Sequence, residues 1–179
     1  MKATGIVRRI DDLGRVVIPK EIRRTLRIRD GDPLEIYTEK DGEVIFKKYS
    51  PVGELSDFAT QICESLYKTA DCTVVVCDRD SVIAAAGVPK KELRERHISD
   101  ELSRIMEGRK LYAAEAGPVI PLSDGDELNY ISVAATILSE GDIMGCVVFV
   151  ARPGAPAPTE LQVKLAETVA GFLGKQMEG

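Results

Sequence analysis

The sequence predicts an α+β protein of two domains, a small β-rich domain at the amino terminus and a larger antiparallel-sheet domain with flanking helices. Three observations predict this organisation. Short β-prone runs with tight-turn signals dominate residues 1–50, helical patterns and apolar strand pairs fill residues 55–179, and SPVG separates the two at positions 50–53. We therefore assign residues 1–50 and 55–179 to separate domains and residues 51–54 to a linker.

Charge is distributed unequally between these domains. The 179 residues carry a net charge of −5, but residues 1–50 hold 12 Lys and Arg against 9 Asp and Glu. The remaining residues hold 12 Lys and Arg against 20 Asp and Glu. A basic amino-terminal domain followed by an acidic domain is typical of a chain that binds nucleic acid through one domain only.

The first helix is expected to follow a turn. Residues 12–14, Asp-Leu-Gly, predict a turn between the β-prone runs IVRRI and RVVI, although IVRRI lacks a clean alternation of apolar and polar residues. Pro19 is suited to a first helical turn, so we predict a helix from Pro19 to about Leu26. Residues 8–29, which contain these elements, hold eight basic and three acidic side chains.

The angular positions on this helix separate its charges from its apolar residues. At about 100° per residue from Arg23, Lys20 lies near 60°, Arg27 near 40° and Arg24 near 100°. Ile22 and Leu26 lie near 260° and 300°, on another arc. The basic arc is equally compatible with an ordinary solvated helix face and with phosphate or base contacts.

A hairpin is expected next, because PLEIYT alternates, Asp41-Gly42 is a tight-turn signal and VIFKKY returns. Fifty residues with short strands and a two-turn helix bury little apolar surface. We therefore expect a second copy of the chain to complete this domain.

The larger domain is predicted to run helix, hairpin, helix, strand, hairpin and helix. The expected helices are 54–69, 90–108, in which Ser99 is suited to be an N-cap, and a last helix capped by Thr159 and Gln162. The expected strands are 73–77, 81–87, 117–122, 129–138 and 143–151, with turns at 78–80 and 140–142. The apolar stripes of its first and last helices predict either coverage of their own sheet or a four-helix bundle with another subunit.

The residues argue against several other functions. No apolar run approaches the roughly 20 residues that span a bilayer, and MKATGIVRRID lacks a secretory signal, so we expect a cytoplasmic protein without membrane contact. The four cysteines form no C-x-x-C pair and His97 is the single histidine, so we expect core thiols, no metal, no cofactor and no catalytic triad. The acidic residues show no spacing that is typical of a catalytic carboxylate pair, so we do not expect an enzyme.

TGIVR, D-x-LGRVVIP and E-[IL]-RRTL, followed by GDPLEIY and V-I-F-KKY, resemble the DNA-binding domain of the AbrB-type transition-state regulators of spore-forming bacteria. The resemblance implies a swapped-hairpin dimer that binds double-stranded DNA and regulates sporulation genes as an activator or a repressor. It also implies a nucleoid location, in the forespore. The positions that match its DNA contacts are Arg8, Arg9, Arg15, Arg23 and Arg24, which Lys20 joins by the angular argument.

The element order of residues 55–179 resembles a GAF domain, a small-molecule sensor module. The resemblance implies a regulatory domain, but no motif identifies a ligand or its binding residues. For the first and last helices of this domain, the resemblance to the AbrB-type regulators implies the four-helix bundle with another subunit. It therefore implies a tetramer of two DNA-binding dimers. The alternative function is that of an antitoxin, because toxin-neutralising proteins share the swapped-hairpin fold, although a folded domain here replaces their disordered tail.

Overall fold

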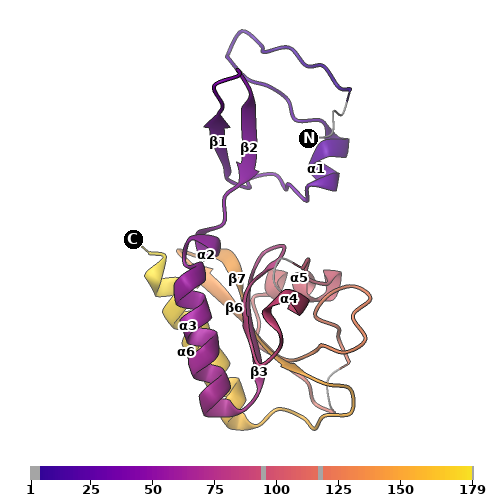
Figure 1. Cartoon of the computed structure of the whole chain (residues 1–179), viewed down its shortest axis with the longest axis vertical. Coiled ribbons are helices and arrows are strands. Elements are labelled where there is room, and N and C mark those ends of the chain that lie inside the picture. Colours follow the sequence, from indigo (N-terminus) through magenta and orange to yellow (C-terminus); the bar gives the residue numbers. More distant parts are fainter. Residues whose placement is uncertain (1–4, 94–95, 117–118, 179) are drawn as a thin grey trace. The chain divides into compact units, whose positions relative to one another are not determined.

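A computed structural model of the chain describes residues 5–93, 96–116 and 119–178, and the chain divides into two units, Met1–Tyr49 and Ser50–Gly179 (Figure 1). In the first unit, α1 spans Lys20–Thr25, β1 spans Leu34–Thr38 and β2 spans Val44–Lys48. The strands pair antiparallel with Ile36 opposite Phe46. Gly42, with a φ of 83°, lies in the connecting turn, as the Asp41-Gly42 signal predicts.

The two β-prone runs around residues 12–14 form no strands, which corrects the prediction for them. The turn itself is present, since the Asp11 N–H donates to the Arg15 carbonyl and the Gly14 N–H donates to the Asp11 carbonyl, both at 3.0 Å. Strands are stable only when neighbouring strands satisfy their backbone groups. Within the described part of a single chain, β1 and β2 pair with each other and not with these runs.

The second unit contains a five-stranded antiparallel sheet in the order β4-β3-β7-β6-β5. Its elements are α2 (Pro51–Glu54), α3 (Ser56–Ala70), β3 (Thr73–Asp78), β4 (Val82–Ala86), α4 (Lys90–Leu93), α5 (Asp100–Glu107), β5 (Tyr112–Ala113), β6 (Tyr130–Ser139), β7 (Asp142–Ala151) and α6 (Glu160–Gln176). The predicted capping box of α6 is confirmed by reciprocal hydrogen bonds between Thr159 and Gln162.

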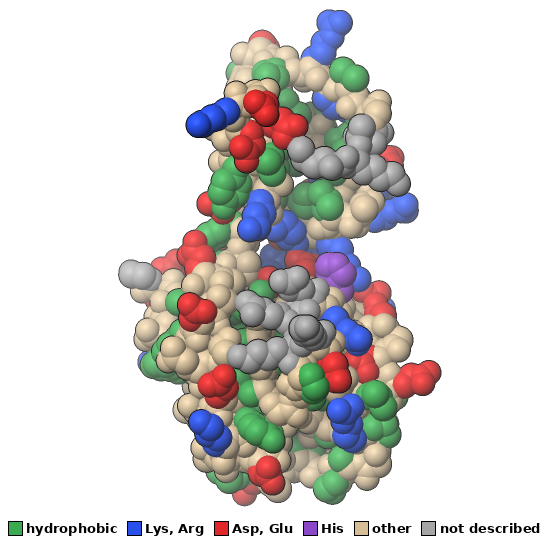
Figure 2. All heavy atoms as spheres, viewed as in Figure 1, with side chains coloured by type: hydrophobic (Ala, Val, Ile, Leu, Met, Phe, Trp, Pro, Cys, Tyr) green, Lys and Arg blue, Asp and Glu red, His purple; other side chains and the backbone are tan. Residues whose placement is uncertain are grey.

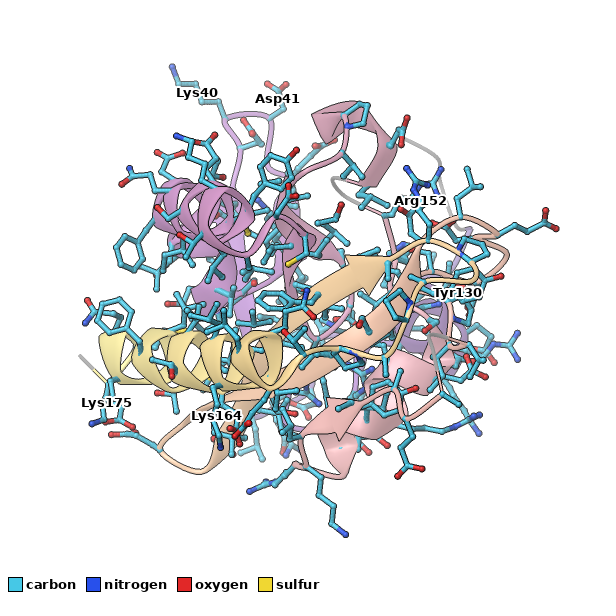
Figure 3. The ribbon with its side chains drawn as sticks, turned by 90° about the horizontal axis from the view of Figure 1, so that it is seen from below. Lys40, Asp41, Tyr130, Arg152, Lys164 and Lys175 are labelled. Atoms are coloured by element: carbon cyan, nitrogen blue, oxygen red, sulfur yellow. The ribbon has the colours of Figure 1, made fainter. Side chains whose placement is uncertain are left out.

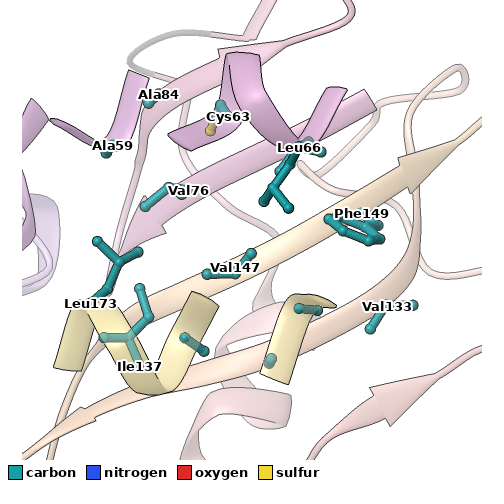
Figure 4. Packing of buried hydrophobic residues seen from close by; sticks show 14 of the residues in the cluster. Ala59, Cys63, Leu66, Val76, Ala84, Val133, Ile137, Val147, Phe149 and Leu173 are labelled. Carbon is teal, nitrogen blue, oxygen red and sulfur yellow. The ribbon is translucent and has the colours of Figure 1, made fainter. Parts of the chain in front are cut away.

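Helices cover both faces of this sheet. On one face, α3 and α6 lie side by side (Figure 1), and Cys63, Leu66 and Leu173 pack with Val147 and Phe149 (Figure 4). A second core lies on the opposite face. Its members from outside the sheet include Leu93, Ile98, Leu102, Met106 and Leu122. Alternation along the strands supplies both cores, which is why the central strands are apolar on both sides.

Residues 51–54, predicted as a linker, form the short helix α2. The Ser50 hydroxyl accepts a hydrogen bond from the Gly53 N–H at 3.1 Å, and Pro51 occupies the first helical turn. The side chain of Val52 is 1% exposed and belongs to the α3–α6 side of the core. This segment therefore packs as part of the second unit.

Two other segments differ from the predicted elements. Over residues 90–108 the helix is interrupted: after α4, Arg96 and Ile98 form hydrogen bonds with β4 and the β3–β4 turn. The chain then starts α5 at Ser99, which confirms the predicted N-cap. In the predicted strand 117–122, residues 117–118 lie outside the described ranges, and Pro121 makes an isolated bridge to Tyr130. The strand that pairs with the outer side of β6 is β5, which the sequence did not indicate. None of the described helices is long and apolar enough to span a membrane.

Candidate nucleic-acid interface

Helix α1 carries three of the six predicted site residues. Pro19 is its N-cap, Glu21 lies in its first turn, and Arg23 and Arg24 lie in its last turn, where each charge complements the helix dipole. The side chains of Lys20 and Arg24 are exposed. The Arg23 side chain is 37% exposed and therefore partly packed.

The chain reverses direction directly after α1. The Ile28 N–H donates to the Arg23 carbonyl at 2.8 Å, the Arg27 N–H donates to the Arg24 carbonyl, and Arg27 adopts a positive φ of 51°. This left-handed residue ends the helix as a glycine usually does. The angular argument, which assumed helix at Arg27, therefore does not place its side chain on the basic arc.

The reversal brings an acid to one of the predicted DNA contacts. Arg23 Nη1 lies 2.6 Å from Asp30 Oδ1, and the Asp30 side chain is 94% exposed. Asp30 lies in a turn that is closed by a hydrogen bond from the Asp32 N–H to the Arg29 carbonyl. Gly31, with a φ of 87°, follows Asp30 in this turn. The sequence did not indicate this ion pair, because it depends on the left-handed residue at the end of α1.

A second acid holds the loop at α1 against the hairpin. The Asp32 carboxylate, 3% exposed, accepts the Arg29 N–H at 2.8 Å and lies 3.3 Å from Lys48 Nζ. Lys48 Nζ, on β2, also donates to the Arg27 carbonyl at 2.9 Å. These contacts fix the end of α1 relative to the β1–β2 hairpin.

The other three predicted site residues flank the turn at residues 12–14. Arg8, Arg9 and Arg15 are exposed. The Asp11 carboxylate accepts the N–H groups of Leu13 and Arg15 at 3.0 and 2.8 Å, and Arg15 Nε lies 2.8 Å from its second oxygen. These hydrogen bonds from the backbone and side chain of Arg15 lower the pKa of Asp11. Among the contacts of the described residues, none joins this group to the basic residues of α1.

Apolar side chains are exposed on the same unit. Val7 is 87% exposed, Ile10 and Val17 are each 70% exposed, and Phe46 of β2 is 42% exposed. Figure 2 shows hydrophobic side chains at the surface of this unit among acidic and basic ones. Large apolar side chains that are exposed at this level are available for contact with another chain.

The second unit offers buried polar groups of a different kind. The Asp126 carboxylate accepts hydrogen bonds from the N–H groups of Leu128 and Asn129 at 2.9 and 3.0 Å and from the Asn129 side chain. Arg96 Nη1 lies 3.3 Å from the same carboxylate. The cluster organises the loop before β6.

Three of the four cysteines, Cys63, Cys77 and Cys146, have buried thiols, and Cys72 is half-buried. Cys77 and Cys146 are buried opposite each other on β3 and β7. The hydrogen bond with Cys146 and burial raise the pKa of the Cys77 thiol well above its usual value, and burial raises the pKa of Cys63 to about 12. Thiols in this state are poor metal ligands and nucleophiles. Within the described ranges, no group of three His, Cys, Asp or Glu side chains could hold a metal ion.

Comparison with known proteins matches both units. Residues 54–178 match the family described as "Stage V sporulation protein T C-terminal, transcription factor", and residues 7–54 match "Antidote-toxin recognition MazE, bacterial antitoxin". The chain is 49% identical to stage V sporulation protein T of Bacillus subtilis over 180 aligned residues, 99% of each chain. It is 57% identical over 63 residues to the transition state regulatory protein AbrB of the same organism, covering 32% of this chain and 65% of that protein.

Similarity to solved structures identifies the fold of the second unit. The second GAF domain of DevS from Mycobacterium smegmatis matches with a TM-score of 0.55 at 13% identity, covering 72% of this chain and 94% of that one. The second unit therefore has a GAF-like fold, as predicted. An AbrB-like first unit joined to a GAF-like second unit defines a two-domain transcription factor. The chain belongs to the stage V sporulation protein T family.

Proposed function

We propose that this transcription factor binds double-stranded DNA through Arg8, Arg9, Arg15, Lys20, Arg23 and Arg24, and activates or represses sporulation genes. The observation that carries the proposal is the concentration of accessible cationic side chains on the first unit of an otherwise acidic chain. Cationic side chains supply affinity by releasing counterions from the phosphates, and arginine also forms paired hydrogen bonds with phosphate and guanine. The site of action is then the nucleoid, and in a sporulating cell the forespore.

The exposed apolar residues of the first unit support dimerisation. In a swapped-hairpin dimer, the runs around residues 12–14 would acquire neighbouring strands from the partner, which the single chain does not give them. Dimerisation would also present two copies of the basic site. A clamp of this kind explains why a domain with a short helix could hold DNA.

The second unit supports a further level of assembly. Phe58 of α3 and Phe172 of α6 have ring centroids 5.8 Å apart, and Phe172 and Leu161 remain 46% and 59% exposed. Packing of these helices against their copies in another subunit would join two dimers into a homotetramer. A small molecule that binds the GAF-like unit would regulate the assembly only if it favoured one of two states.

Replacing Arg24 or Arg23 by alanine is expected to weaken binding to duplex DNA roughly tenfold, because each dimer loses two cationic contacts. With about six contacts per dimer neutralising phosphates, the wild-type logarithmic affinity should fall with logarithmic salt concentration at a slope near −5. Each variant should reduce the magnitude of this slope by about 2. Fluorescence anisotropy across a salt series measures both quantities. Lys40→Ala removes the same charge at the β1–β2 turn and is the control. Binding unchanged in both arginine variants, or a wild-type slope near zero, would contradict the proposal.

Replacing Val17 by aspartate is expected to reduce the mass of the assembly, because a carboxylate would enter the interface that two first units share. Leu13→Asp is the matched control, since both side chains are 70% exposed in the single chain but Leu13 lies in the turn. Sedimentation equilibrium of the full chain at micromolar concentration measures the mass. Equal masses for V17D and the wild type would rule out this interface.

The match of residues 7–54 to an antitoxin family keeps a second function open, that of a protein that neutralises a toxin. In this chain, a folded GAF-like unit follows the matched segment where antitoxins carry a disordered tail. Co-purification of a small toxin with the tagged protein from its own cells would favour the antitoxin function over gene regulation.

A further inference from the structure

Among the described residues, Asp11, Asp30 and Asp32 each pair with a basic side chain of the first unit, but they differ in their other contacts. The carboxylates of Asp11 and Asp32 accept backbone N–H groups as well as lying next to a cation, so they build the turn and the loop. The described contacts of the Asp30 carboxylate consist of its pair with Arg23, at 2.6 Å. An exposed ion pair of this kind contributes little to stability.

The position of Asp30 nevertheless requires a specific backbone path. Arg27 adopts a left-handed conformation that non-glycine residues seldom adopt, and Gly31 follows with another positive φ. The path is secured by Asp32, whose buried carboxylate holds the Arg29 N–H and Lys48. The chain therefore returns along the end of α1 and presents the carboxylate of Asp30 to Arg23.

We propose that Asp30 is an electrostatic brake on Arg23, which lowers the affinity of the first unit for DNA and makes its release faster. This inference rests on the proposed DNA-binding function. Before Arg23 contacts a phosphate, its guanidinium must leave Asp30 or share its donors with it. The exposed carboxylate then remains close to the phosphate backbone and repels it. In a dimer this opposition acts at two sites.

Asp30→Asn tests the brake, because asparagine keeps the size of the side chain and removes its charge. We expect D30N to bind duplex DNA roughly three- to tenfold more tightly at moderate salt and to show a steeper salt dependence. The control is Asp41→Asn, which makes the same change in net charge at the β1–β2 turn, where Asp41 projects outward (Figure 3). Fluorescence anisotropy gives the affinities, and stopped-flow dissociation should show a slower release for D30N.

A double-mutant cycle shows whether the effect passes through Arg23. In an Arg23→Ala background, D30N should raise affinity no more than D41N does. An affinity of D30N that equals that of D41N in the wild-type background, or falls below the wild-type affinity, would overturn the brake. The brake would also be overturned if D30N raised DNA affinity in the R23A background as much as in the wild-type background.

The same measurements separate the two proposals. If the intact wild-type protein does not bind duplex at low salt, the proposed DNA-binding function fails and the brake fails with it. If the wild type binds and R23A weakens binding, but D30N behaves like D41N, only the brake is wrong. The thermal unfolding midpoint of each variant tests whether folding is unchanged, and we expect no change for D30N because the Asp30 side chain is exposed.

Discussion

Replacing Gly174 by alanine is expected to lower the free energy of unfolding of the second unit by roughly 3 kcal/mol or more. Gly174 is buried on α6, where the helix approaches β6. A Cβ added at this position would fall on the carbonyl group of Leu138. Because the obstructing atoms belong to the backbone of a paired strand, neither they nor the helix can move without losing the packing around Leu173.

Gly171 provides a control in the same helix. No atom lies within 4 Å of a Cβ added there, so Gly171→Ala is expected to stabilise α6 by about 0.5–1 kcal/mol through helix propensity. Urea denaturation followed by circular dichroism measures both variants against the wild type. If G174A and G171A shift the midpoint in the same direction, the close approach of α6 to β6 is not what Gly174 serves.

Much of the fold could be predicted where local chemistry determines it. The Asp41-Gly42 and Glu140-Gly141 turns fix two hairpins, and Thr159 with Gln162 fixes the start of α6. Ser99 marks the start of α5, but the end of α4 could not be predicted, because the chain between the two helices is held by hydrogen bonds of Arg96 and Ile98 to the distant residues Val82 and Asp80. Helical periodicity carries no information about such partners.

The candidate site was predictable to a similar extent. The six basic residues could be chosen from motif and helix angle, but their environment depends on the path of the chain. The pairing of Arg23 with Asp30 requires a left-handed Arg27, which sequence patterns assign to glycine. The runs around residues 12–14 have the residues of strands, yet within the described ranges they pair with no strand of the chain. Sequence therefore selects candidate DNA contacts but does not show which neighbouring groups restrain them.

The loop before β6 is expected to depend on Asp126. Replacing Asp126 by alanine should destabilise the second unit by about 2–4 kcal/mol, because the N–H groups of Leu128 and Asn129 and the Asn129 amide lose their acceptor. Glu127→Ala, at an exposed neighbouring position, should change stability by less than about 0.5 kcal/mol. Urea denaturation at neutral pH measures the difference.

The dependence on pH distinguishes the charge of Asp126 from its shape. Burial raises the pKa of this carboxyl, but hydrogen bonds from Asn129 and the backbone, together with Arg96, outweigh burial and hold the pKa below its usual value. The stabilisation is therefore present above about pH 4 and is lost as the pH falls through the lowered value. Asp126→Asn keeps an acceptor oxygen but cannot titrate, so its deficit at neutral pH should shrink as the wild type weakens in acid. A deficit that stays constant from pH 7 to pH 3 would mean that Asp126 acts through its shape alone, and that the charge of Arg96 does not contribute.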